Sequence, residues 1–122
     1  MTPTVVLVVD DDARNRKLVC DVIRHAGLEA LEAATGRHAV TMARTHVPGV
    51  ILMDLRLPDL DGSAALALLQ AEPETASIPV VALTAIAGAA DALLAAGFAG
   101  YIEKPIDVRE LAAQVRAYCA AR

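Results

Sequence analysis

The chain has 122 residues, which is enough for one domain with an apolar core and too few for a second domain of ordinary size. Its hydrophobic fraction of 56%, inflated by 26 alanines, excludes a disordered chain, while two Tyr, one Phe and a net charge of −4 disfavour nucleic-acid binding. The apolar runs fall short of the roughly 18 residues that a membrane helix needs, and we see no secretory signal, so we expect a cytoplasmic protein.

Five short stretches rich in apolar, β-branched residues predict β-strands. The run Val5–Val9 is continuously apolar and too short for a helix, which is typical of a strand buried on both faces. The runs 50–53 and 79–83 repeat this pattern. The second run begins with Pro79, and a strand tolerates proline in its first position. Residues 28–33 and 100–102 are weaker candidates for the second and fifth strands.

Longer stretches between these runs have helical periodicity. One helix ends before Gly27, and its apolar face comprises Leu18, Val19, Val22, Ile23 and Ala26. Less amphipathic helices are expected over 36–44, 63–70 and 89–96. Asp107 and Glu110 form a pair like a capping box before a last helix, whose apolar face comprises Val108, Leu111, Ala112, Val115 and Cys119. Because Cys20 and Cys119 lie in these helices without a metal-binding spacing, we expect two reduced core thiols.

Strict alternation of strand and helix predicts an α/β fold. Right-handed crossovers then give a parallel sheet covered by helices on both faces. Ligands of such sheets bind beyond the carboxyl ends of the strands. The chemistry is therefore expected just after residues 9, 53, 83 and 102.

Acidic residues follow the first and third predicted strands. Asp10, Asp11 and Asp12 exceed what helix capping requires, although one aspartate there is ordinary. Asp54 follows four apolar strand residues, where an unpaired carboxylate is costly. If the two strands are neighbours, repulsion among these carboxylates raises a pKa or recruits a cation. Oxygen ligands favour Mg²⁺, whereas zinc is disfavoured because the histidines lie in or after predicted helices, as surface residues: His25, His38 and His46.

The other two strand ends supply a hydroxyl and an ammonium group. Thr84 follows the fourth predicted strand, and Lys104 lies two residues beyond the fifth. A metal site with a hydroxyl, a cation and a carboxylate nucleophile suits transfer of a phosphoryl group onto an aspartate.

Four motifs in order make the chain resemble the receiver domain of two-component response regulators. They are VVLVVDDDARN at 5–15, ILMDLRLPDLDG at 51–62, IPVVALTA at 78–85 and GYIEKPID at 100–107. The resemblance covers essentially the whole chain. It implies a flavodoxin-like, doubly wound (βα)5 sandwich with strand order 2-1-3-4-5, occupying residues 1–122.

The resemblance also implies roles for single residues. Asp54 resembles the phosphoacceptor, and Asp10 and Asp11 resemble the pair that holds Mg²⁺, joined by Asp54 and the backbone carbonyl of Arg56. Capping remains the expected role of Asp12. The resemblance further implies a switch hydroxyl, a switch aromatic and a phosphate-pairing lysine followed by a cis proline bond: Thr84, Tyr101, Lys104 and Pro105.

The resemblance implies a signalling switch rather than an enzyme. A sensor histidine kinase or a histidine phosphotransfer protein would donate the phosphoryl group, and no output domain is expected in this chain. The output would be a partner protein bound on the face of helix four, strand five and helix five. We expect a monomer or a weak, phosphorylation-dependent dimer.

One departure from the family pattern affects this output face. Between Thr84 and Gly100 the chain is about two residues shorter than the usual family pattern, and the stretch 86–90 lacks the usual charges. Because the loss falls where helix four begins, we expect a reshaped output face. Ile86, two residues after Thr84, is expected to shield the acyl phosphate from water and so to prolong its lifetime.

Three alternatives stay open on the sequence. Asp10 and Asp12 form a DxD pattern, as in small Mg²⁺-dependent aspartyl-phosphate phosphatases, although those usually carry a cap and more chain. A flavodoxin-like cofactor binder shares the architecture, but three aspartates would repel its phosphate. The chain could also be a receiver piece of a hybrid kinase.

Overall fold

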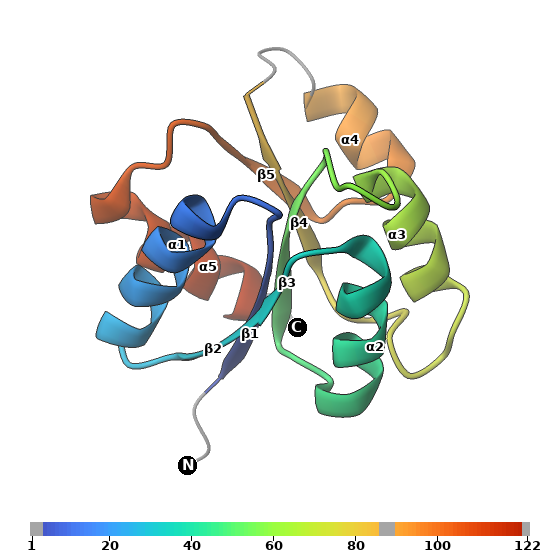
Figure 1. The fold of residues 1–122 in the computed structure, drawn as a ribbon, viewed down its shortest axis with the longest axis horizontal. Helices are drawn as coiled ribbons and strands as arrows, with labels where there is room; N and C mark the ends of the chain where they lie inside the picture. Colours follow the sequence, from blue (N-terminus) through green and yellow to red (C-terminus); the bar gives the residue numbers. More distant parts are fainter. Residues whose placement is uncertain (1–3, 86–89, 121–122) are drawn as a thin grey trace.

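The computed structural model describes residues 4–85 and 90–120, where five strands alternate with five helices (Figure 1). The strands are β1 (Val5–Val9), β2 (Glu29–Ala33), β3 (Val50–Asp54), β4 (Val80–Thr84) and β5 (Gly100–Glu103). The helices are α1 (Ala13–His25), α2 (Gly36–His46), α3 (Gly62–Gln70), α4 (Ala90–Ala96) and α5 (Val108–Ala120). Neighbouring strands are parallel, in the order β2-β1-β3-β4-β5, which confirms the predicted fold class and strand order.

Helices cover both faces of the sheet. Figure 1 shows α1 and α5 on one face and α2, α3 and α4 on the other. Along β3, Val50 and Leu52 pack in the cluster that includes α1 and α5 residues, whereas Ile51 and Met53 pack in the cluster with α2, α3 and α4. Successive residues of a strand point to opposite faces of the sheet, and helices cover both faces. The residues on both faces must therefore be apolar, which explains the uninterrupted apolar runs.

Polar residues in the loops that follow β1, β2 and β3 cap the next helices. The side chain of Asp12 accepts hydrogen bonds from the backbone N–H groups of Arg14 and Asn15, which confirms its capping role at α1. Thr35 and Asp61 cap α2 and α3 in the same way. These caps satisfy backbone donors that have no partner within the helix.

Several predicted boundaries and faces differ from the structure. Asp54 is the last residue of β3 rather than the residue after it, and Pro79 precedes β4. Leu18, predicted for the apolar face of α1, is 43% exposed. The residues of α1 that are buried are Val19, Cys20 and Ile23. The predicted helical start at residue 89 and the predicted shielding residue Ile86 lie outside the described residues.

Similar corrections apply to the last helix. Val108, predicted for its apolar face, is 45% exposed in the first turn of α5, whereas Leu111 and Val115 are fully buried. Cys119 is half-buried at the margin of the core rather than inside it. The side chain of Asp107 accepts from the N–H of Arg109, so it does act at the start of α5.

Two general predictions concern the rest of the surface. All three histidines are exposed, as expected. Within residues 4–85 and 90–120, no helix combines the length and the apolar character needed to cross a membrane.

The register of the sheet brings the strand ends together at one edge. Val9 of β1 lies opposite Met53 of β3, and Thr84 of β4 lies opposite Glu103 of β5. The residues that follow or end these strands therefore converge at this edge, where the sequence predicts the site.

Candidate functional site

Asp10 lies immediately after β1 and is almost completely buried, with 1% exposure. Its backbone N–H donates to the carbonyl of Ala33 (3.1 Å), which continues the pairing of β1 with β2. Its Oδ1 accepts from the backbone N–H of Asp12 (2.9 Å). Asp11 is exposed beside it. The turn into α1 therefore fixes one carboxylate in the interior and leaves another at the surface.

Asp54 ends β3 and is also buried, at 9% exposure. Its Oδ1 accepts from the backbone N–H of Arg56 (3.1 Å), and its Oδ2 accepts from Nζ of Lys104 (3.1 Å). Each carboxylate oxygen thus has one donor. The Lys104 ammonium balances the charge of a carboxylate that burial would otherwise disfavour.

Lys104 reaches the site from the residue after β5. Its backbone N–H donates to the carbonyl of Thr84 (2.7 Å), and its peptide bond to Pro105 is cis, as the resemblance implies. Its Nζ also lies 3.9 Å from Oδ2 of Asp10, within an ion-pair distance but without a hydrogen bond. Thr84, with 4% exposure, ends β4 next to this lysine.

The carboxylates form a cluster that fits a divalent cation. One oxygen from each of Asp10, Asp11 and Asp54 lies within 4.8 Å of the others. Oδ2 of Asp10 is buried and has no hydrogen-bond partner, which is costly for a carboxylate unless a cation compensates. Burial raises the pKa of Asp10 above its ordinary value, and the charges of Asp54 and Asp11 act in the same direction. The hydrogen bond from Asp12 and the charge of Lys104 oppose the increase. An oxygen-only donor set of this kind suits Mg²⁺.

These residues line one open cleft of about 440 Å³ at the carboxyl edge of the sheet. The cleft brings together six of the seven predicted site residues: Asp10, Asp11, Asp54, Arg56, Thr84 and Lys104. Tyr101 does not line it. Its half-buried ring instead packs against the core cluster on the α2, α3 and α4 face. The structure thus separates Tyr101 from the acidic cluster.

Sequence reasoning missed two residues at this cleft, Asn15 and Arg16, and one in the loop after β3, Asp59. Asn15, in the first turn of α1, lines the cleft. Arg16 donates to the carbonyl of Asp10. Asp59 accepts from the backbone N–H groups of Gly36 and Arg37 and so joins the loop after β3 to the start of α2. The partners of Asp59 lie 22 and 23 residues away, so no local pattern could have indicated them.

Comparison with known proteins identifies similar sequences and structures. Residues 6–116 match the profile of the response regulator receiver domain. The polar-differentiation response regulator DivK of Brucella anthropi is 36% identical over 118 residues, a match that covers 95% of this chain and 96% of the relative.

Two solved structures show the same fold. The receiver domain of a sensor histidine kinase from Pseudomonas aeruginosa, with a magnesium ion coordinated in its active-site cleft, has a TM-score of 0.88 and 30% identity, covering 98% of this chain and 99% of that chain. The chemotaxis response regulator CheY4 of Vibrio cholerae has a TM-score of 0.90 and 26% identity, covering 96% and 99%.

Proposed function

The chain belongs to the response regulator receiver domain family of two-component signalling, and on that premise we propose that Asp54 accepts a phosphoryl group. One observation carries the proposal. A buried carboxylate, paired with Lys104, faces a cluster of two further carboxylates in an open cleft. We propose a phosphohistidine of a sensor kinase or of a phosphotransfer protein as the donor.

The proposed reaction is a displacement at phosphorus. A carboxylate oxygen of Asp54 attacks, the new O–P bond forms, the P–N bond of the phosphohistidine breaks, and the imidazole leaves with the electron pair. The arrangement supports this role because the N–H of Arg56 and Nζ of Lys104 already orient the carboxylate. Lys104 is then the cation that pairs with the transferred group.

The proposed cofactor is Mg²⁺, held by Asp10, Asp11, Asp54 and the carbonyl of Arg56. When bound, it would neutralise charge on the phosphoryl oxygens. The three clustered carboxylates and the buried Oδ2 of Asp10, which lacks a hydrogen bond, support this assignment. The magnesium ion in the Pseudomonas aeruginosa receiver domain occupies the active-site cleft of that protein.

We further propose that Thr84 and Tyr101 form the switch. Thr84 lines the cleft, while Tyr101 lies on β5 opposite Ala82, two residues before Thr84 on β4. Phosphorylation would shift an existing equilibrium between two arrangements of these residues and change binding of a partner protein at α4, β5 and α5. In this proposal the domain is a cytoplasmic signalling switch rather than an enzyme, and a monomer or weak dimer.

The experiment is labelling with acetyl phosphate and Mg²⁺, followed by intact mass spectrometry. Wild type is expected to gain one phosphoryl group, and Asp54→Asn none, because the amide is a poor nucleophile. Asp12→Asn is the matched control, since Asp12 lines the same cleft but caps α1. Undiminished labelling of Asp54→Asn would refute the assignment. Loss of labelling in Asp10→Asn without an effect of Asp54→Asn would instead favour phosphatase chemistry at Asp10.

A further inference from the structure

Nearly every polar group of Asp10 is fixed by a hydrogen bond. Its N–H donates to Ala33, its Oδ1 accepts from Asp12, and its carbonyl accepts from Nη1 of Arg16 (2.8 Å). The exception is Oδ2, which is buried without a hydrogen bond, in a carboxylate that contributes one oxygen to the acidic cluster. The direction of this oxygen is therefore set by the groups that hold the rest of the residue.

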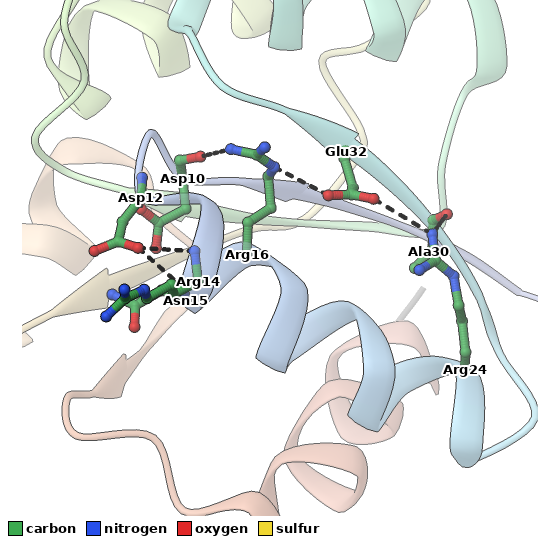
Figure 2. A network of polar contacts seen from close by, with 8 residues as sticks. All are labelled: Asp10, Asp12, Arg14, Asn15, Arg16, Arg24, Ala30 and Glu32. Carbon is green, nitrogen blue, oxygen red and sulfur yellow. Dashed lines mark hydrogen bonds and ion pairs between the residues drawn. The ribbon is translucent and has the colours of Figure 1, made fainter.

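Arg16 is itself anchored from the other side. Its Nε donates to Oε1 of Glu32 on β2 (3.0 Å), and its side chain is only 19% exposed. Figure 2 shows the guanidinium of Arg16 between the carbonyl of Asp10 and the carboxylate of Glu32. The second oxygen of Glu32 lies 3.6 Å from Nη2 of Arg24. The chain of contacts thus runs from the cleft to the second strand of the sheet.

The geometry requires arginine rather than any cation. A guanidinium is planar and presents donors in fixed directions, so two simultaneous hydrogen bonds define its plane. A lysine has a single nitrogen on a flexible stem and holds two acceptors on opposite sides less well. Arg16 also donates to the carbonyl of Asp10 rather than to its carboxylate, so its effect on the site is one of geometry.

We infer that Arg16 is a positioning residue for the divalent-cation site. Held by Glu32, it fixes the backbone of Asp10 and thereby sets the direction of the Asp10 carboxylate within the cluster that it forms with Asp11 and Asp54. Mutating a residue that orients a metal ligand without touching the metal commonly lowers metal affinity by about ten- to a hundredfold. The inference rests on the proposed function for the identity of the cation, Mg²⁺.

The test measures Mg²⁺ binding to the full chain by titration calorimetry, in the absence of any phosphoryl donor. Arg16→Gln and Arg16→Lys are both expected to weaken binding about tenfold. Arg24→Gln is the matched control, because Arg24 contacts the same Glu32 and the carbonyl of Ala30 but no residue of the cluster. We expect Arg24→Gln to change the affinity by less than about twofold. Glu32→Ala removes the outer anchor and is expected to weaken binding less than Arg16→Gln.

A second readout separates positioning from general destabilisation. In acetyl phosphate labelling, the Mg²⁺ concentration at half-maximal rate is expected to rise with the change in affinity, while the rate at saturating Mg²⁺ stays within about twofold of wild type. If Arg16→Gln does not fold, Arg16→Lys and Glu32→Ala carry the test.

Two results would overturn the inference alone: wild-type Mg²⁺ affinity in the Arg16 variants, or an equal loss of affinity in Arg24→Gln. A wild-type chain that neither binds Mg²⁺ nor accepts a phosphoryl group would overturn the proposed function together with the inference.

Discussion

Replacing Lys104 by methionine keeps the length of the side chain and removes the cation from the acidic cluster. Nζ lies 3.1 Å from Oδ2 of Asp54 and 3.9 Å from Oδ2 of Asp10. At an effective dielectric constant of about 20, each attraction is roughly 4–5 kcal/mol before desolvation is subtracted. The side chains of Lys104 and Asp54 are 24% and 13% exposed, so solvent screens part of this energy. Exposed ion pairs contribute at most about 1 kcal/mol to stability, and breaking a buried pair costs about 3–5 kcal/mol. Because this pair is intermediate in burial, we expect Lys104→Met to lower the free energy of unfolding by about 2 kcal/mol.

Thermal unfolding at pH 7, without divalent cations, measures this loss. For a domain of this size, about 2 kcal/mol corresponds to a fall in Tm of roughly 8 °C. Because the variant has unbalanced carboxylates, added Mg²⁺ is expected to stabilise Lys104→Met more than wild type and to narrow the difference in Tm.

Lys17→Met provides the control for this prediction. Lys17 lies only 2.8 Å from Asp21, but the two side chains are 74% and 53% exposed, so we expect no measurable change in Tm. The reasoning is refuted if Lys104→Met without cations is as stable as wild type, or if Mg²⁺ stabilises both proteins equally. The first result would mean that solvent already screens the cluster, and the second that the cation does not bind among these carboxylates.

Two further predictions concern residues outside the cluster. Hydrogen bonds from the backbone N–H groups of Arg37 and Gly36 hold the pKa of Asp59 in the folded protein below its ordinary value of 3.8. The ionised carboxylate therefore stabilises the fold above pH 3.8, and this contribution is lost as the pH falls through the lowered pKa of the folded protein. Asp59→Asn places an amide nitrogen against these donors and is expected to lower Tm at pH 7, with a difference from wild type that disappears in acid; a constant difference down to pH 2 would contradict the sign. Burial raises the pKa of the Cys20 thiol to about 11, so we expect Cys119 to react quickly with a disulfide reagent at pH 8 and Cys20 only as fast as the domain opens. Equal, rapid labelling of both thiols by mass spectrometry would show that Cys20 is accessible.

The alternation of strands and helices was enough to predict a parallel sheet and the edge at which its polar strand ends lie, and the physical reason is local; the strand order came from the resemblance to receiver domains. A strand buried on both faces needs an uninterrupted apolar run, which any reader can find at Val5–Val9. The charged or hydroxylated residues that end such runs must meet at one edge of a parallel sheet. Asp54 and Lys104 are 50 residues apart, yet the alternation of strands and helices already placed both at the same edge of the sheet.

Which face of a helix is buried against the sheet could be determined only from the tertiary structure. Periodicity marks several neighbouring residues as apolar, but only packing decides which of them face the sheet. Leu18 lies exposed and Cys20 buried because α1 contacts the core through Cys20, and the sequence pattern around them fits both orientations.

The polar contacts that support the site were also decided only by the tertiary structure. Arg16 on α1 meets Glu32 on β2, and Asp59 meets the start of α2, through contacts that span 16 and 23 residues. An arginine or aspartate on a surface segment has many partners within reach, and its side chain carries no periodic signal that selects one. The sequence by itself therefore determined which polar groups lie at the carboxyl edge of the sheet. The packing of α1 against β2 decided how Asp10 is held there, because that packing sets the distance at which a guanidinium reaches both its carbonyl and Glu32.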